Sequence, residues 1–198
     1  MSIIEPNLNQ EYWDNRYNKN EIGWDIGAPS TPLKEYFDTI SDKTISILIP
    51  GAGNACEAEY LIGKGFKNVS VIDISRKAWE NIKTRIPELL EEQIICADFF
   101  NWIGQYDLII EQTFFCALNP NLRLNYVEKM AELLKPDGLL IGLLFQKELN
   151  TEHPPFGGNS NEYQSLFETQ FRIHKMETAY NSIPPRANSE LFIKLSVK

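Results

Sequence analysis

Two glycines and two carboxylates stand where successive apolar runs of this sequence end. Gly51 and Gly53 follow the run "SILIP", Asp73 closes "NVSVID", and Asp98 closes "EQIICAD". Glycine lets a backbone turn sharply and approach a ligand without a Cβ in the way. A carboxylate 22 residues after Gly51 is well placed to accept hydrogen bonds from both hydroxyls of a ribose. The types and spacing of these residues predict a site for a nucleoside-bearing ligand.

The glycine turn lacks the complete signature of a dinucleotide site. The GxGxxG fingerprint would need a third glycine at Cys56, where it permits close helix–strand packing beside a pyrophosphate. A Walker loop is excluded because no Gly-Lys-Ser/Thr follows. A ligand with adenosine but no pyrophosphate, such as S-adenosylmethionine (SAM), fits better. The alternatives are an NAD(P)-dependent oxidoreductase on the same kind of sheet and a non-catalytic SAM-binding module.

Each of these residues also has a purely structural explanation. A Gly-x-Gly turn after a strand is common, and an Asp at a strand end often caps the next helix. Asp73 and Asp98 are both followed by segments that read as helical. Their recurrence at three successive strand ends is what favours a ligand site.

Apolar runs alternate with helical segments from Thr44 onward. The expected strands are "TISILIP", "NVSVID", "EQIICAD", "YDLIIEQ" and "DGLLIGLLF". Such alternation is typical of a parallel sheet covered on both faces. In the tail, two apolar runs, "FRIHKMETA" and "ELFIKLSVK", flank a turn-rich segment and predict an antiparallel pair. We expect a single domain, with an aromatic N-terminal lid over residues 1–43 and a doubly wound α/β core over residues 44–198.

Composition limits the compartment and the partners. A chain of 198 residues with 43% hydrophobic content is expected to form one soluble domain. A net charge of -8 without a run of Lys or Arg argues against a nucleic-acid surface, and no apolar run reaches the roughly 20 residues of a membrane span. Cys56, Cys96 and Cys116 lack CxxC spacing, which predicts free thiols and no metal site. We expect a cytoplasmic monomer that acts on a small molecule.

Longer motifs resemble those of one enzyme family. The segment "YWDNRYNKNEIGWDIGAPSTPL" is followed in order by "LIPGAG", "VIDIS", "ADFFNW", "YDLIIEQTFFCALNP", "LLKPDG", "HPPFGGN" and "SIPPR". This series, from Tyr12 to Arg186, resembles class I SAM-dependent methyltransferases, and among them the thiopurine S-methyltransferase family, closest to its halide/thiol methyltransferase branch. The resemblance implies a Rossmann-like fold with a mostly parallel seven-stranded sheet, an antiparallel C-terminal strand and an N-terminal helical lid.

The resemblance also implies roles for individual residues. The lid aromatics would enclose SAM, the glycine turn would pass under its methionine part, and carboxylates would hold the ribose and flank the adenine. The implied cofactor-binding residues are Trp13, Tyr17, Trp24, Gly51, Gly53, Asp73, Ile74, Asp98, Phe99 and Gln112. The candidate substrate-side residues are Tyr17, Gln112, Phe156 and Arg186. No side chain is assigned as a certain catalytic group, and none as a metal ligand.

Methyl transfer to a small soft nucleophile suits these residues. In-line displacement needs donor and acceptor held close together, and aromatic faces stabilise a desolvated cation such as a sulfonium by about 0.5–2 kcal/mol. A thiolate or halide that meets a sulfonium gives neutral products, so a dry pocket favours the step and no general base is required. His153 and His174 form no recognisable base constellation. We expect methylation of a thiol, sulfide, halide or thiopurine-like compound, with S-adenosylhomocysteine (SAH) as the product.

Overall fold

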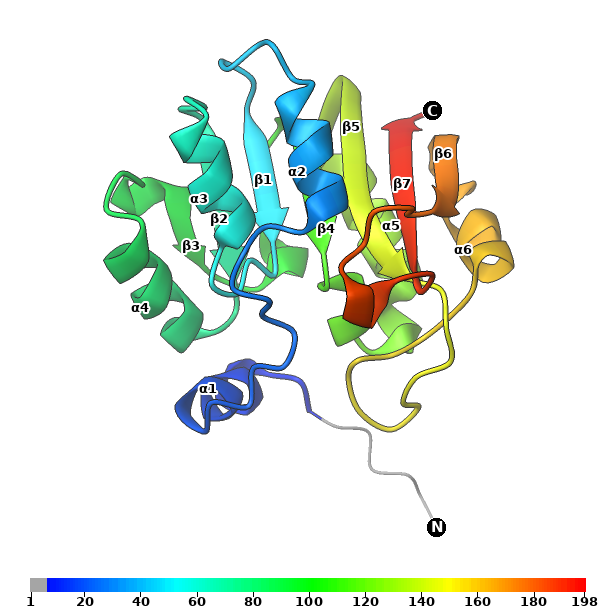
Figure 1. Cartoon of the computed structure of the whole chain (residues 1–198), viewed down its shortest axis with the longest axis horizontal. Coiled ribbons are helices and arrows are strands. Elements are labelled where there is room, and N and C mark those ends of the chain that lie inside the picture. Colours follow the sequence, from blue (N-terminus) through cyan, green and yellow to red (C-terminus); the bar gives the residue numbers. More distant parts are fainter. Residues whose placement is uncertain (1–6) are drawn as a thin grey trace.

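A seven-stranded sheet forms the centre of the computed structural model, which describes residues 7–198 (Figure 1). The strand order is β3-β2-β1-β4-β5-β7-β6. The five parallel strands are β1 (Ile47–Pro50), β2 (Val69–Asp73), β3 (Ile94–Cys96), β4 (Tyr106–Gln112) and β5 (Leu134–Phe145). The strand β7 (Glu190–Val197) runs antiparallel between β5 and β6 (Phe171–Thr178). The predicted sheet, with its antiparallel strand at the C-terminus, is confirmed.

Helices cover both faces of the sheet, each over its own hydrophobic cluster. On one face lie α2 (Thr31–Asp38), α3 (Cys56–Gly63) and α4 (Arg76–Arg85), with buried side chains such as Leu61 and Ile82. On the other face lie α5 (Arg123–Leu133) and α6 (Ser160–Phe167), with Tyr126 and Phe167. Five 3-10 turns complete the elements: η1 (Glu91–Gln93), η2 (Phe99–Asn101), η3 (Phe115–Ala117), η4 (Pro120–Leu122) and η5 (Pro184–Arg186).

The helix α2 belongs to the core, although the sequence placed it in the lid. Leu33 and Phe37 are fully buried in the same cluster as Ile47 of β1 and Leu61 of α3. Burying two large apolar side chains stabilises a helix against a sheet by about 1.5–3 kcal/mol each. The boundary predicted after residue 43 is therefore too late, because a lid cannot include a helix that is anchored in this way.

The helix α1 (Gln10–Asn18) lies beyond the carboxyl ends of the parallel strands (Figure 1), in contact with α4. Asn9 caps it, because the Asn9 side chain accepts a hydrogen bond from Tyr12 N at 3.0 Å. No residue of α1 is buried, so core packing does not hold the helix in place. Polar contacts do: Asp14 Oδ1 accepts hydrogen bonds from Ser75 Oγ (2.6 Å) and Lys77 N (3.0 Å) at the amino end of α4.

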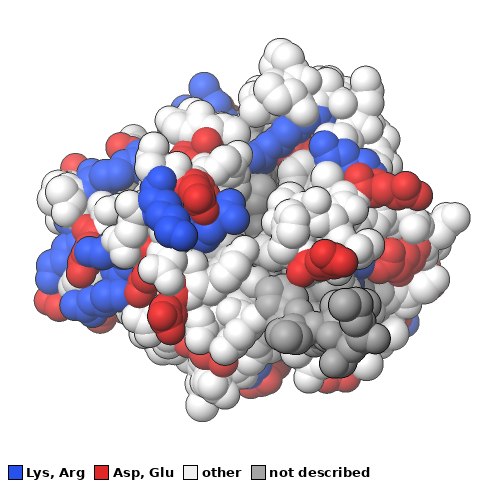
Figure 2. Space-filling view, turned by 90° about the horizontal axis from the view of Figure 1, so that it is seen from below, with Lys and Arg blue, Asp and Glu red and all other residues white. Residues whose placement is uncertain are grey.

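Lys and Arg are interspersed with Asp and Glu over the face shown in Figure 2. Among residues 7–198, no helix has both the length and the apolar content needed to cross a membrane. Cys56, Cys96 and Cys116 are all free thiols, as the sequence predicted.

Candidate functional site

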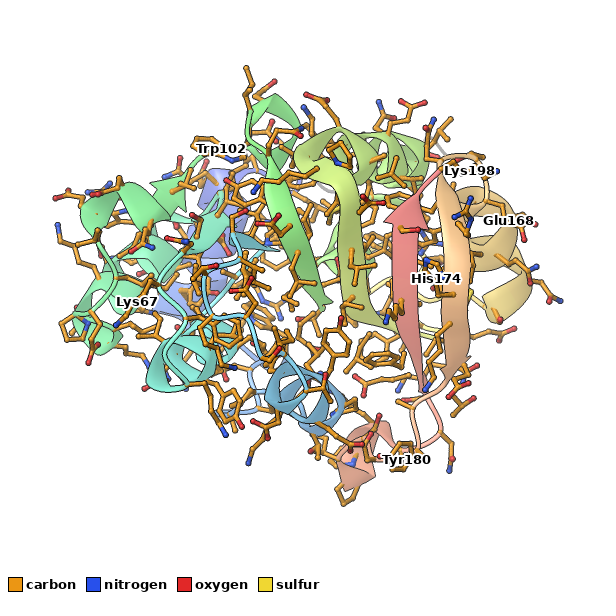
Figure 3. The ribbon with its side chains drawn as sticks, turned by 90° about the horizontal axis from the view of Figure 1, so that it is seen from above. Lys67, Trp102, Glu168, His174, Tyr180 and Lys198 are labelled. Atoms are coloured by element: carbon orange, nitrogen blue, oxygen red, sulfur yellow. The ribbon has the colours of Figure 1, made fainter. Side chains whose placement is uncertain are left out.

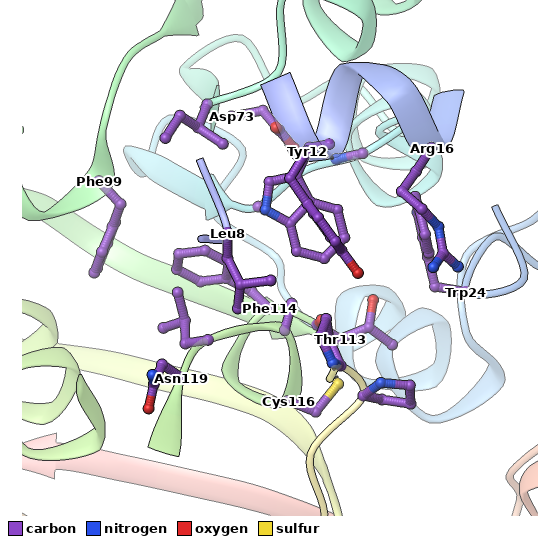
Figure 4. Close-up of a pocket in the computed structure, with 18 of the residues that line it drawn as sticks. Leu8, Tyr12, Arg16, Trp24, Asp73, Phe99, Thr113, Phe114, Cys116 and Asn119 are labelled. Atoms are coloured by element: carbon purple, nitrogen blue, oxygen red, sulfur yellow. Dashed lines mark hydrogen bonds between the residues drawn. The ribbon is translucent and has the colours of Figure 1, made fainter. Parts of the chain in front are cut away.

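A cavity of about 840 Å³ opens between α1 and the carboxyl ends of the parallel strands (Figure 4). Its walls come from α1, the ends of β1, β2 and β3, the loop after β4, and the segments around residues 145–155 and 185–186. The carboxyl edge of a doubly wound sheet is where ligands of such folds bind. The volume lies in the upper part of the range for small-molecule sites, about 300–1,000 Å³, so a drug-sized ligand leaves room for a second small molecule.

The glycine turn forms the floor of this cavity and leaves no room for side chains. Gly51 has a φ of +57°, and a Cβ added there would lie 2.3 Å from Phe114 Cδ2. Gly53 also has a φ of +57°, and its added Cβ would lie 3.3 Å from the Tyr17 hydroxyl. Both positions need the left-handed backbone that glycine adopts without strain. The turn therefore brings bare backbone against the cavity.

Asp73 ties the end of β2 to the glycine turn. Its Oδ2 accepts a hydrogen bond from Gly53 N at 3.0 Å, and its Oδ1 accepts one from Ser75 N at 2.8 Å. The cap of α4 is Ser75, whose Oγ accepts from Ala78 N at 3.1 Å, so the capping explanation of Asp73 does not hold. Desolvation raises the pKa of Asp73 to about 6. Each of its oxygens keeps lone-pair capacity for a ligand hydroxyl.

For Asp98 the capping explanation does hold. Its Oδ1 accepts a hydrogen bond from Phe100 N at 2.9 Å and so caps η2, and its side chain is exposed at the rim of the cavity. Phe99 beside it is 5% exposed and makes an edge contact with the Phe114 ring at 5.2 Å. This corner of the cavity is thus an apolar wall, which also includes Ile74, with one carboxylate at its edge.

Three aromatic residues of the lid form a connected wall. The Trp24 ring makes edge contacts with Trp13 at 5.6 Å and with Tyr17 at 5.7 Å. Desolvation raises the pKa of Tyr17, so its hydroxyl is neutral at physiological pH. All three line the cavity. The helix α1 therefore presents aromatic rings to the cavity although it carries no buried residue.

Sequence reasoning missed two neighbours of these aromatics. Tyr12 and Arg16 lie one turn apart on α1, and both side chains point into the cavity (Figure 4). The i, i+4 spacing places residues on one face of a helix, and this was the available signal once α1 was recognised as a helix. Arg16 also contacts the face of Trp24, with its Cζ 5.7 Å from the ring centroid.

The loop after β4 is held by a buried carboxylate that the sequence analysis did not identify as important. Glu111 is fully buried and accepts hydrogen bonds from Phe114 N (2.8 Å), Phe115 N (2.9 Å) and the Tyr126 hydroxyl (2.5 Å). Desolvation raises the pKa of Glu111 to about 7. These bonds fix the loop in which Thr113 adopts a φ of +58°, so that Phe114 lies against Gly51.

Cys116 follows in the same loop and lines the cavity. Its Sγ donates to Thr113 O at 3.4 Å, and desolvation raises the pKa of its thiol to about 12. It is therefore a neutral thiol at physiological pH and a poor nucleophile, because the thiolate is the reactive form.

Only two of the four candidate substrate-side residues line the cavity. Tyr17 and Arg186 line the cavity, whereas Gln112 lines a small annex beside it and Phe156 lines neither. Phe156 is 3% exposed, and its N–H donates to Cys116 O at 2.7 Å. Pro154 and Pro155 of the same loop reach the cavity instead.

Arg186 is committed to contacts within the protein. Its Nη1 lies 3.4 Å from Glu190 Oε1, and its Nη2 donates to Trp24 O at 2.8 Å across 162 positions of sequence. It thus holds the connector that carries Trp24, a role that no sequence pattern indicated.

The charges that line the cavity are of both signs. The acidic residues are Asp73 and Asp98, at the ends of β2 and β3, and the basic residues are Arg16, Lys147 and Arg186. Neither histidine lines it, and Figure 3 shows His174 on β6, towards the far edge of the sheet. Among the described residues there is no group of three or more His, Cys, Asp and Glu side chains that would hold a metal ion.

Comparisons with known proteins agree with this geometry. The family model of thiopurine S-methyltransferase (TPMT) matches residues 8–192. A probable thiol methyltransferase 2 of Arabidopsis thaliana is 29% identical over 159 residues, which cover 78% of this chain and 70% of that protein. Thiocyanate methyltransferase 1 of the same plant is 27% identical over 195 residues, covering 96% of this chain and 86% of that protein.

A solved structure shares the fold. The 1,6-didemethyltoxoflavin-N1-methyltransferase of Burkholderia thailandensis, with 1,6-didemethyltoxoflavin and SAH bound, superposes with a TM-score of 0.74 at 15% identity. The match covers 96% of this chain and 86% of that one. At this identity the likeness concerns the fold, which is that of a class I methyltransferase.

Proposed function

The chain belongs to the thiopurine S-methyltransferase family, and from this premise we propose that it transfers the methyl group of SAM to a small soft nucleophile, with a thiol as the leading acceptor. The observation that carries the proposal is the cavity at the carboxyl edge of the sheet, which combines an aromatic lid with Asp73 and the bare glycine turn. The names of the plant relatives, a thiol and a thiocyanate methyltransferase, support a sulfur acceptor.

The described residues fit SAM better than a dinucleotide. Asp73 offers lone pairs to ribose hydroxyls, and Phe99 and Ile74 offer an apolar wall to an adenine. The missing third glycine is no obstacle, because SAM has no pyrophosphate. We therefore do not propose the nicotinamide-dependent activity considered from the sequence.

SAM supplies a methyl group on a positively charged sulfur when it is bound. Trp13, Tyr17 and Trp24 would stabilise that charge through their ring faces and exclude water from it. Their contribution, about 0.5–2 kcal/mol for a desolvated cation, grows as water leaves the site. Holding the acceptor close to the methyl group of SAM would supply the larger part of the rate enhancement.

The acceptor would enter beside Cys116, Pro154 and Pro155, on the side of the cavity that also carries Lys147. A basic side chain at this end favours an acceptor that arrives as an anion, such as a thiolate. An anion needs no side chain to remove a proton, which agrees with the absence of histidines from the cavity lining.

A panel of acceptors tests the proposal. Purified protein with SAM is given bisulfide, thiocyanate, iodide, an aryl thiol and a thiopurine, and SAH is quantified. We expect SAH to form with at least one sulfur acceptor. Turnover restricted to oxygen or nitrogen acceptors would show that the proposed acceptor class is wrong.

Asp73 gives the cofactor site a predicted pH dependence. A carboxylate accepts hydrogen bonds from both ribose hydroxyls, whereas its protonated form accepts less well. Because the pKa of Asp73 is about 6, the affinity for SAH should fall as the pH falls through that value. Asp73→Asn should weaken SAH binding about 10- to 100-fold at pH 7.5 and flatten this dependence, as measured by calorimetry from pH 5 to 8. A pH dependence that is unchanged in the variant would contradict the assignment.

We also propose that the chain acts as a cytoplasmic monomer in which α1 and the connector to α2 form the lid. Three free thiols support a reducing compartment. Light scattering at micromolar concentration tests the monomer, which a mass near twice 22.8 kDa would contradict.

A further inference from the structure

Tyr12 and Arg16 carry polar groups that the proposed function does not use. Both side chains are half-buried and line the main cavity, and Figure 4 shows the Tyr12 hydroxyl and the Arg16 guanidinium pointing into it. The two residues lie one helical turn apart, so the same face of α1 presents both groups. The lid therefore brings a cation and a hydroxyl to the cavity in addition to its aromatic rings.

The outer nitrogens of the Arg16 guanidinium are free to bind a ligand. Its Nε donates to Glu21 O at 3.1 Å and lies 3.5 Å from Glu21 Oε2, and its Cζ lies 5.7 Å from the centroid of the Trp24 ring. These contacts hold the guanidinium in place and offset part of its charge. Arg16 Nη1 and Nη2 and the Tyr12 hydroxyl have no hydrogen-bond partner among residues 7–198. Two such nitrogens can donate the paired hydrogen bonds that a carboxylate accepts from an arginine.

Lys147 adds a second basic group with a free end. Its Nζ lies 5.3 Å from the centroid of the Phe145 ring and has no hydrogen-bond or salt-bridge partner among the described residues. The carboxylates that line the cavity, Asp73 and Asp98, stand at the ends of β2 and β3, where the ribose and the adenine would lie. Arg16 and Lys147 therefore give the remaining part of the cavity a positive charge, which suits an anionic acceptor.

The reacting sulfur is not the group that the Arg16 guanidinium suits best. During methyl transfer the thiolate sulfur forms a bond to the methyl carbon, the bond from that carbon to the cofactor sulfur breaks with its electron pair going to that sulfur, and the thiolate loses its negative charge. A guanidinium bound to the thiolate would stabilise the ground state more than the transition state and slow the step. An anionic group that takes no part in the reaction keeps its charge throughout, so binding it to Arg16 carries no such penalty.

We propose that Tyr12 and Arg16 form an acceptor-specificity site for thiols that also carry a carboxylate; this inference rests on the proposed methylation of thiols. Arg16 Nη1 and Nη2 donate to the carboxylate, and the Tyr12 hydroxyl donates a further hydrogen bond to it. Lys147 contributes attraction at longer range. The carboxylate fixes the acceptor in the cavity, and the thiolate remains free to react.

A pair of acceptors that differ in charge tests the proposal. The wild type with SAM is given 4-mercaptobenzoate or 4-mercaptobenzamide at pH 7.5, where both aryl thiols are ionised, and kcat/KM is measured from SAH formation. We expect kcat/KM to be at least about 10-fold higher for the carboxylate acceptor. Equal values, a preference for the amide, or turnover of bisulfide and thiocyanate but of neither aryl thiol overturns the proposal. SAH formation with no sulfur acceptor at all contradicts the proposed function itself.

Binding of the methylated products tests the same site without turnover. The protein saturated with SAH is titrated by calorimetry with 4-(methylthio)benzoate and with 4-(methylthio)benzamide. We expect the benzoate to bind at least about 10-fold more tightly, because only its carboxylate pairs with Arg16. Affinities within about 3-fold of each other overturn the proposal.

Variants link the preference to the lid. In Arg16→Met the ratio of the two kcat/KM values should fall to within about 3-fold of unity, and in Tyr12→Phe it should fall about 3-fold. Arg172→Met, the same change on an exposed residue of β6 outside the cavity lining, should keep the ratio of the wild type. A ratio that is unchanged in Arg16→Met, while SAH affinity falls more than about 10-fold, assigns Arg16 to the cofactor and overturns the proposal. The wild-type comparisons remain decisive if a variant does not fold.

Discussion

Gly51→Ala should abolish SAH binding, with an affinity loss of at least about 100-fold in calorimetry. Two costs combine at this position. The φ of +57° is unfavourable for alanine, and its Cβ would lie 2.3 Å from Phe114 Cδ2 and 2.8 Å from Phe114 Cβ. Because the contact includes the Phe114 Cβ, a change of rotamer cannot relieve it, so either the turn or the loop after β4 must move. Both contribute to the floor and wall of the cavity.

Substitutions of two other glycines serve as controls that distinguish the effect of the Cβ clash from the effect of backbone strain. Gly65 has a φ of +93° but nothing within 4 Å of an added Cβ, and Gly63 has neither feature. Gly65→Ala should cost about 1–2 kcal/mol of stability with SAH affinity unchanged. Gly63→Ala, at the end of the helix α3, should leave SAH affinity unchanged and raise stability by up to about 1 kcal/mol. If Gly51→Ala bound SAH within about 3-fold of the wild type, the turn would not be the floor of the cofactor site.

The parts of the fold that local pattern determines were predictable. Each predicted strand from "TISILIP" to "ELFIKLSVK" corresponds to an observed one. The five parallel strands among them are recognisable because strands of this kind, buried on both faces, read as continuous apolar runs. Gly51, Gly53 and Asp73 could also be expected to lie close together, because the carboxyl ends of parallel strands meet at one edge of the sheet.

The lid was harder to predict because contacts distant in sequence position it. Asp14 is held by Ser75 and Lys77, and Trp24 O by Arg186, and neither pairing leaves a local signal. The same limit explains why α2 was assigned to the lid: its aromatic sequence does not reveal which surface it packs against. Phe156 was misjudged similarly, since only the folded loop shows that its neighbours Pro154 and Pro155 reach the cavity.

The importance of Glu111 could have been predicted from the sequence. It stands one residue before Gln112 at the end of an apolar strand, so strand alternation places the two side chains on opposite faces. A carboxylate inside an apolar run is costly unless it is well hydrogen-bonded, which signals a specific partner. That partner set, two loop amides and the Tyr126 hydroxyl, is what the structure supplies.

Glu111→Ala should lower the free energy of unfolding by about 3–5 kcal/mol in urea denaturation at pH 7. The substitution leaves two backbone donors and a buried hydroxyl without an acceptor and opens a cavity where the side chain was. Tyr126→Phe should cost less, about 1–2 kcal/mol, because the carboxylate keeps both loop amides. A loss below about 1 kcal/mol for Glu111→Ala would mean that the loop does not depend on this carboxylate.

The raised pKa of Glu111 adds a pH signature to this effect. The folded protein holds the Glu111 proton up to a pH of about 7, whereas the unfolded chain releases it near the ordinary value of 4.5. Between these values the folded state binds more protons, so the contribution of Glu111 to stability falls as the pH rises, by up to about 1.4 kcal/mol per pH unit. The glutamine of Glu111→Gln cannot ionise, so the unfolding free energy of this variant relative to the wild type should rise by about 2 kcal/mol from pH 5 to pH 7.5.

Asp73 also has a raised pKa, but it is present in both proteins, so its effect cancels in the difference. Tyr163→Phe removes a buried hydroxyl that donates to Phe145 O instead, so its pH dependence should match the wild type. Parallel stability curves for the wild type and Glu111→Gln would show that Glu111 is ionised throughout this range.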